Sequence, residues 1–194
     1  MTDMTEAEVL AAFEEAHAVL TGHFRLTSGR HSDRYVQCAR VLEDPALVTR
    51  LAQAIAQRLG ERRIDLVAAP AVGGIVIGFA VAQALGVKFI FSERENGVMT
   101  FRRGFEVPEG ARVLVVEDVV TTGGSVAEVI ALVEAAGGVP VAVASLIDRG
   151  GPKSFDVELL PLLRLKVESW ELDSCGLCAS DVPLYAPGSR ALSK

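Results

Sequence analysis

Two acidic residues lie between an apolar run and a loop of hydroxyl-bearing residues and glycines. The stretch Val113–Ser125 reads as four apolar residues, then Glu117 and Asp118, two more apolar residues, and Thr121–Ser125, which is Thr-Thr-Gly-Gly-Ser. The apolar run predicts a buried strand, and the residues that follow the loop predict a helix. Such a loop presents unpaired backbone N–H groups at a helix N-terminus, where the helix dipole favours an anion. The loop and the helix that follows it therefore predict a phosphate site.

The paired carboxylates argue against a site for phosphate alone, because like charges repel. A phosphorylated sugar suits both halves of the motif. Carboxylates accept hydrogen bonds from a ribose diol, and their charge stabilises the cation that develops on the ring when the anomeric bond breaks. The loop lacks the Gly-Lys-Ser/Thr of an ATPase phosphate loop. An alternative, a plain hairpin turn at Gly123-Gly124, leaves the acids and the helix unexplained.

Strands and helices alternate around this motif, and each predicted strand is a nearly continuous apolar run. Such runs are typical of a parallel sheet that is covered on both faces. The fold class predicted is therefore α/β, with a mostly parallel sheet and helices on both faces. Ligands bind beyond the carboxyl ends of such strands. The predicted elements are strands at Ile64–Ala69, Val87–Phe91, Arg112–Val116 and Val139–Ile147, and helices at Gly74–Leu85 and Ser125–Ala136.

The segments outside this pattern are shorter and more polar. A capping box predicts a helix that begins after Thr5 and ends near Gly22, and a polar turn at Thr27–Asp33 predicts a hairpin. Asp44–Gly60 predicts a further helix, because Asp44 is an N-cap residue that precedes a proline. In the tail, Leu163–Val167 is a possible edge strand.

The connection Phe91–Arg112 spans about twenty residues, longer than compact domains usually contain. It carries Arg94, Arg102 and Arg103, and a weak alternation over Val98–Phe105 that suggests a small hairpin. We expect this segment to be a lid that excludes water from a reacting site.

Composition narrows the class of protein. The chain has 194 residues, half of them hydrophobic, which predicts one domain, 1–194. A net charge of -6 argues against nucleic acid as a partner. The apolar stretch Ile64–Phe91 contains Asp65, Pro70 and several glycines, so we expect no membrane span. Three cysteines and an acidic N-terminus without a secretory signal favour the cytoplasm.

Val113–Ser125 resembles, throughout its length, the signature that binds 5-phosphoribosyl 1-diphosphate (PRPP) in type I phosphoribosyltransferases. Phe24–Tyr35 resembles the substrate segment of the orotate phosphoribosyltransferase branch. Pro70–Gly74 is similar to the pyrophosphate loop of that branch, and Asp148-Arg149 and Pro187–Arg190 extend the similarity over most of the chain. The resemblance implies the fold of this family, with a small hood built from about residues 1–40 and 150–194.

The resemblance also implies an activity: transfer of the 5-phosphoribosyl group from PRPP to orotate in pyrimidine biosynthesis, giving orotidine 5′-monophosphate and pyrophosphate. It implies Mg²⁺ held mainly through PRPP, with no direct protein ligand, and a homodimer that shares the loop between its sites. Glu117, Asp118 and Arg94 are then catalytic, and Thr121 and Arg149 bind orotate. The residues implied to bind PRPP are Arg94, Glu117, Asp118, Val119, Val120, Thr121, Thr122, Gly123, Gly124 and Ser125.

The chain departs from the family pattern at several basic positions. Many members have a lysine where this chain has Thr27 and Val72, and the loop has Glu95 where a lysine follows the first arginine, Arg94. Neutralisation of the charge on the leaving pyrophosphate then depends on Mg²⁺, on Arg94 and on an arginine later in the loop. Arg102 and Arg103 are equally compatible with the solvated face of a hairpin.

Two other functions remain open from the residues. One is a phosphoribosyltransferase for another base, since the PRPP motif is shared and base choice depends on fewer residues. The other is a regulatory protein that senses PRPP on the same fold.

The remaining candidates carry no assigned role. We expect His31 to lie on a surface turn, and His17 and His23 to lack a ligand partner. Cys175 and Cys178 have metal-ligand spacing, but we expect no second Cys or Cys/His pair to complete four ligands, so a structural zinc site is the minor alternative.

Overall fold

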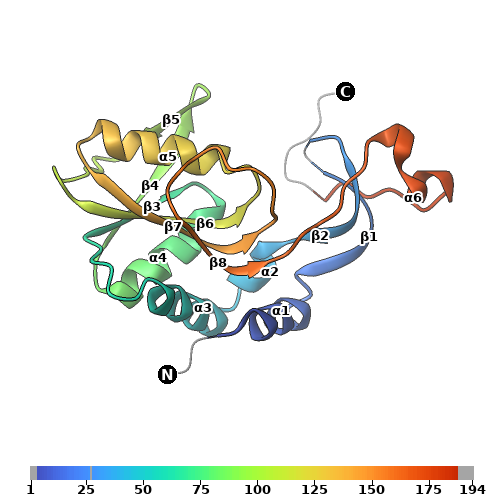
Figure 1. The fold of residues 1–194 in the computed structure, drawn as a ribbon, viewed down its shortest axis with the longest axis horizontal. Helices are drawn as coiled ribbons and strands as arrows, with labels where there is room; N and C mark the ends of the chain where they lie inside the picture. Colours follow the sequence, from blue (N-terminus) through green and yellow to red (C-terminus); the bar gives the residue numbers. More distant parts are fainter. Residues whose placement is uncertain (1–3, 27, 188–194) are drawn as a thin grey trace.

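The apolar runs assemble into a six-stranded sheet in the order β5-β4-β3-β6-β7-β8, beside a separate two-stranded hairpin (Figure 1). This computed structural model describes residues 4–26 and 28–187. The predicted α/β class is confirmed. The elements are α1 Glu6–Glu15, β1 Val19–Arg25, β2 His31–Val36, α2 Cys38–Leu42, α3 Pro45–Arg58, β3 Leu66–Pro70, α4 Gly73–Leu85, β4 Lys88–Glu95, β5 Val98–Phe101, β6 Arg112–Val120, α5 Gly124–Ala135, β7 Val139–Asp148, β8 Leu159–Arg164, η1 Leu172–Ser174 and α6 Gly176–Ala179.

Five of the six strands of the large sheet run parallel, and the edge strand β5 is antiparallel to β4. Consecutive residues of a strand point to opposite faces, so each apolar run supplies both layers of the core. Val67 and Leu114 pack with α1, α3 and α4, whereas Leu66 and Val113 pack under α5. Figure 1 shows these helices on the two sides of the sheet. Helices on both faces are therefore confirmed.

The hairpin β1–β2 lies to one side of the large sheet, and the C-terminal segment runs along it (Figure 1). Tyr185 forms a bridge to Phe24 on β1, and Trp170 forms a bridge to His31 on β2. We call β1, β2 and residues 168–187 the hood. The hood thus joins parts of the chain that lie near its two ends.

The expectation that the first helix extends to Gly22 is wrong. The helix α1 ends at Glu15, and His17 adopts a φ of 51°. The N–H of Ala18 donates to the carbonyl of Phe13, and that of His17 donates to Glu14, which is the hydrogen-bond pattern of a Schellman turn. A residue other than glycine holds the left-handed position, so the sequence carried no clear stop signal.

The connection after Phe91 is shorter than predicted, because strand and hairpin occupy its first part. Strand β4 continues to Glu95 and pairs with β5 around the turn Asn96-Gly97, whose φ values are 50° and 85°. Asn-Gly is a strong hairpin signal, because both residues tolerate positive φ. The small hairpin suggested by the alternation is therefore present, but its strand β5 covers only Val98–Phe101.

Two further boundaries differ from the prediction. Strand β6 extends beyond Val116 to Val120, so the acids are part of the strand. The edge strand of the tail is confirmed in kind, but β8 covers Leu159–Arg164 and pairs with β7. Part of the Pro187–Arg190 match lies outside the described residues, as does Thr27. Among the helices described, none combines the length and apolar character that a membrane span requires.

Candidate active site

The acid pair lies near the carboxyl end of β6, between the flanking strands β3 and β7. Oε1 of Glu117 accepts a hydrogen bond from the backbone N–H of Asp118 at 3.1 Å, and Oδ1 of Asp118 accepts one from Val119 at 2.7 Å. Burial raises the pKa of Glu117 well above its usual range, and the neighbouring Asp118 raises it further. Glu117 is therefore held in an environment that disfavours its charged form.

The N-terminus of α4 packs directly against these acids. A Cβ on Gly73 would lie 2.7 Å from Oδ1 of Asp118, so only glycine allows this approach. The loop Pro70–Gly74, similar in sequence to a pyrophosphate loop, is thereby placed beside Asp118, and Val72 within it is 82% exposed. A shallow pocket lies here, lined by Val72, Gly73, Val76 and Asp118 together with residues of α2.

The loop Thr121–Ser125 follows β6 immediately and leads into α5. Gly123 has a φ of 80°, a conformation that favours glycine, and it is the N-cap of the helix. Thr121 and Thr122 are exposed. The first amides of α5 have no partner within the helix and are free to bind an anion. The predicted strand, acid pair, loop and helix are therefore assembled as one unit.

The segment after β7 lies along this loop. The backbone N–H of Arg149 donates to the carbonyl of Val120 at 2.9 Å, and that of Ser154 donates to Thr122 at 2.8 Å. Nζ of Lys153 donates to the carbonyl of Thr121 at 2.8 Å and forms an ion pair with Asp148. Sequence analysis did not identify Lys153, because nothing in its neighbours marks it. Lys153 therefore holds the start of the loop Thr121–Ser125 in place through a backbone carbonyl.

Arg149 is thus next to the end of β6. Its Nε is buried, and it has no hydrogen-bond partner among the described residues. Burial lowers the pKa of Arg149, and the nearby Tyr35 opposes that shift. Burial likewise raises the pKa of Tyr35, and the charge of Asp118 also raises it. The hairpin β1–β2 therefore brings an aromatic hydroxyl toward the same space as Arg149 and Asp118.

The three loop arginines are placed differently from the acids. Arg94 lies on β4 and pairs with Glu128 of α5, with Nη2 2.8 Å from Oε2. Arg103 forms two hydrogen bonds to Glu93, at 2.8 and 2.9 Å, and Arg102 pairs with Glu95. Arg102 and Arg103 thus have partners on the hairpin itself, as the solvated-face alternative requires.

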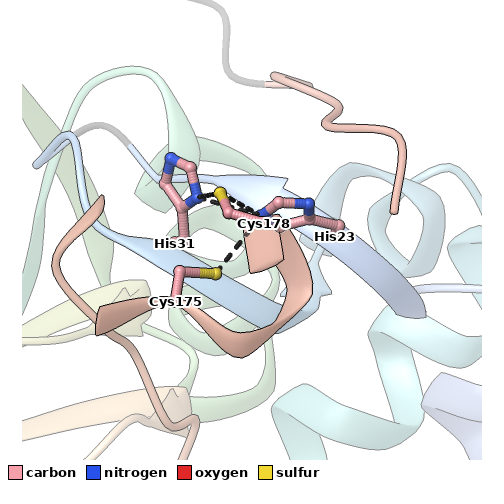
Figure 2. A group of neighbouring side chains, drawn as sticks. All are labelled: His23, His31, Cys175 and Cys178. Carbon is pink, nitrogen blue, oxygen red and sulfur yellow. Dashed lines mark hydrogen bonds between the residues drawn. The ribbon is translucent and has the colours of Figure 1, made fainter. Parts of the chain in front are cut away.

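Two expectations about histidine and cysteine are wrong. His31 does not lie on a surface turn: it is 2% exposed, because β2 and the bridge to Trp170 enclose it. Cys175 and Cys178 do have nearby ligand partners, since His23 and His31 lie beside them (Figure 2). The partners come from the other end of the chain, so sequence spacing could not reveal them.

Comparisons with known proteins agree with this geometry. Residues 38–160 match the model of the phosphoribosyl transferase domain. The chain is 50% identical to the orotate phosphoribosyltransferase of Heliobacterium modesticaldum over 190 residues, covering 96% of this chain and 100% of the relative. It is 47% identical to the orotate phosphoribosyltransferase of Desulforamulus reducens over 191 residues, covering 98% and 100%.

Solved structures give the same family. The orotate phosphoribosyltransferase of Aeropyrum pernix superposes with a TM-score of 0.70 at 28% identity, covering 81% of this chain and 94% of that one. An adenine phosphoribosyltransferase from Thermoanaerobacter pseudethanolicus superposes with a TM-score of 0.58 at 22% identity, over 68% and 88% of the two chains, and shows the fold alone. From the acid pair, the glycine loop and these matches together, the chain belongs to the phosphoribosyltransferase family, in its orotate phosphoribosyltransferase branch.

Proposed function

We propose that this chain transfers the 5-phosphoribosyl group from PRPP to orotate, releasing orotidine 5′-monophosphate and pyrophosphate, as a step of pyrimidine biosynthesis. The observation that carries the choice of orotate is the buried, unpartnered Nε of Arg149 beside the end of β6. A guanidinium has a planar set of donors that suits a carboxylate or paired carbonyl oxygens. Orotate offers both, so it would satisfy a donor that is costly to leave unpaired.

The sugar phosphate would occupy the space beyond β6. The loop from Thr121 to Ser125 would hold the 5′-phosphate through its amides and hydroxyls, with Val119 and Val120 leading into it. Glu117 and Asp118 would accept hydrogen bonds from the ribose diol. Asp118 would stabilise the positive charge on the ring as pyrophosphate leaves.

Mg²⁺ suits this donor set. It prefers hard oxygen ligands and is usually held by one or two carboxylates plus substrate phosphates. Burial disfavours the charged form of Glu117, so PRPP oxygens would supply the ligands and the protein would hold Mg²⁺ mainly through PRPP. When bound, Mg²⁺ neutralises charge on the leaving pyrophosphate.

For the leaving group this chain's own residues would be the Pro70–Gly74 loop and Arg94. In the described chain Arg94 is engaged with Glu128, so a catalytic role requires that this ion pair open when PRPP binds. Thr121 is exposed at the start of the phosphate loop and would also face the pyrimidine.

We further propose a cytoplasmic homodimer. Val72, Val76 and Phe79 form an exposed apolar row at the start of α4, 82%, 45% and 60% exposed, beside the proposed pyrophosphate loop. A second copy of the chain would cover this row and place its own β4–β5 hairpin near the site. All three cysteines are free thiols, which suits a reducing compartment. A monomer in light scattering at micromolar concentration would contradict the dimer.

One assay tests the activity and its two alternatives. Purified protein, PRPP and Mg²⁺ are incubated with orotate, uracil, hypoxanthine or adenine, and pyrophosphate release is followed. We expect release with orotate alone. Release with a different base would support a phosphoribosyltransferase of other specificity. PRPP binding by calorimetry without any release would support the regulatory alternative.

A further inference from the structure

Four potential metal ligands gather in the hood, away from the acid pair. His23 lies on β1, His31 begins β2, Cys175 precedes α6, and Cys178 lies within α6 (Figure 2). The side chains of His23, His31 and Cys175 are almost fully buried, at 1%, 2% and 4% exposure. Burying four polar ligand groups together is unfavourable unless they find partners.

The four ligand atoms lie close together. Nε2 of His23 lies 2.9 Å from Nδ1 of His31, and Sγ of Cys178 lies 3.2 Å from the same Nδ1. Sγ of Cys175 and Sγ of Cys178 lie 3.5 and 3.7 Å from Nε2 of His23. All four atoms fall within 4.8 Å of one another. In a tetrahedral zinc site, bond lengths of about 2.0 and 2.3 Å place ligand atoms roughly 3.3 to 3.8 Å apart.

Hydrogen bonding alone does not satisfy this group. Nδ1 of His23 lies 2.8 Å from the carbonyl oxygen of Val182, which can only accept, so Nδ1 carries the proton. In the tautomer with its proton on Nδ1, Nε2 has a single lone pair, and His31, Cys175 and Cys178 all lie near it. One lone pair cannot accept three hydrogen bonds well. A single cation at the centre would use that lone pair and those of the other three atoms at once.

We propose that His23, His31, Cys175 and Cys178 bind one Zn²⁺ ion. Both thiols lose their protons to solvent on binding, so two thiolates balance the charge of the ion and the imidazoles remain neutral. The carbonyl of Val182 acts on the outer side of His23: it fixes the ring orientation and the tautomer, as second-shell acceptors do in zinc sites.

The donor set favours zinc over the alternatives. Two thiolates and two imidazoles in a closed tetrahedron are typical of structural Zn²⁺. A two-iron cluster with the same residues would place the sulfur pair and the nitrogen pair on different irons. Here Nε2 of His23 is close to both sulfurs, which suits one ion. The site has no fifth group and no open position among the described residues, so it is structural rather than catalytic.

The ion would fasten the C-terminal segment to the hairpin. The helix α6 has four residues, too few to be stable alone, and an isolated two-stranded hairpin is marginal. Trp170 and Tyr185 attach the segment to opposite strands of the hairpin, and the two cysteines lie between these attachments. Zinc would therefore hold the hood together and keep Tyr35 of β2 near Arg149.

The test uses the full chain without a polyhistidine tag, purified in the absence of chelators from zinc-supplemented medium. Metal analysis of the wild type should give about one zinc per chain, and Cys178→Ser and His31→Asn should each lose it. His17→Asn and Cys38→Ala are matched controls and should retain the metal, since neither residue belongs to the cluster. Substitution with Co²⁺ should produce tetrahedral visible bands with thiolate charge transfer.

A measurement on the unaltered chain guards against variants that fail to fold. A strong chelator should lower the melting temperature of the wild type and expose residues 168–187 to protease, and added Zn²⁺ should reverse both effects. The proposal is overturned if the wild type carries no zinc and gains no stability from it, if iron and sulfide are found instead, or if mass analysis shows a Cys175–Cys178 disulfide. Loss of the metal from both control variants would also overturn it.

Discussion

The acid pair of β6 and the histidine–cysteine cluster of the hood are assembled in opposite ways. Glu117, Asp118 and the phosphate loop are adjacent in sequence, on one strand and the turn after it. In the hood, by contrast, Cys178 lies 147 residues from His31 and 155 from His23. A contiguous site can be recognised from residue types and spacing, whereas a site made of distant pairs becomes visible only in the folded chain.

The comparison also separates two kinds of dependence. The acids lie on a central strand whose stability comes from apolar neighbours on both faces, so their chemistry can be altered while the strand remains. Few apolar residues of the hood are buried, whereas three of the four residues of its histidine–cysteine cluster are. Changes in the acid pair should therefore affect turnover, and changes in the cluster should affect stability.

The largest effect is expected from Asp118→Asn. This variant keeps the shape of the side chain but removes the charge that stabilises the ring cation, so turnover should fall about 10²- to 10³-fold. Its melting temperature should change little. Steady-state kinetics at saturating PRPP, orotate and Mg²⁺, with a thermal melt of the same sample, provide the test. Unchanged turnover would remove Asp118 from the mechanism and with it the contrast between the two regions.

A smaller effect is expected from Arg149→Lys, which replaces a planar set of donors with a point charge. The KM for orotate should rise roughly 10- to 100-fold, as expected for a lost hydrogen bond to a charged group, while the KM for PRPP stays the same. The matched control is Arg112→Lys at the opposite end of β6, where the guanidinium donates to the carbonyl of Arg63. An equal rise in both KM values would show a general disturbance of the site.

Next comes a pH effect on stability from Glu117→Gln. Folding raises the pKa of this carboxyl above its ordinary value of 4.5, so the folded chain holds the proton more tightly than the unfolded chain. The stability that this group contributes is fully present below pH 4.5 and is lost as the pH rises through the raised pKa.

Glutamine cannot ionise, so the wild type should lose stability relative to Glu117→Gln as the pH rises above 4.5. Thermal melts of both proteins across a pH series measure this difference. The exposed helix variant Glu134→Gln serves as the control and should follow the wild type. A constant difference between the wild type and Glu117→Gln at every pH would contradict the expected titration.

The smallest effect is expected from Arg103→Ala. The side chain is 60% exposed and paired with Glu93 on the same hairpin, and exposed ion pairs contribute little. Turnover should stay within about twofold of the wild type. A large loss of turnover would instead place Arg103 on the leaving pyrophosphate and make the hairpin part of the site.

The strongest sequence predictions were those in which local pattern and tertiary packing agree. The strands around Val67 and Leu114 are apolar because both of their faces are buried, so their runs in sequence predict the sheet directly. The acids and the loop followed from spacing. Boundaries were weaker: the polar residues Glu93–Glu95 extend β4 through pairing with β5.

What the sequence could not predict depends on partners distant in the chain. The burial of His31 results from pairing with Trp170, and the position of the phosphate loop depends on Lys153, whose ammonium reaches the carbonyl of Thr121. Neither Trp170 nor Lys153 belongs to a recognisable sequence motif. The Asn96-Gly97 turn, by contrast, could have been predicted, because Asn-Gly in the sequence is itself a hairpin signal.

The two attachments of the C-terminal segment have one more consequence. The N–H groups of His31 and Trp170 donate to each other's carbonyls at 2.8 Å, and on the other side Arg25 and Tyr185 continue the ladder. Both margins of the two-stranded sheet are thus occupied by the chain's own backbone. A chain shortened before Trp170 would leave unpaired amides and carbonyls along both margins, a ready template for strand addition from neighbouring molecules. Residues 168–187 therefore also protect the margins of the hairpin from aggregation through strand pairing.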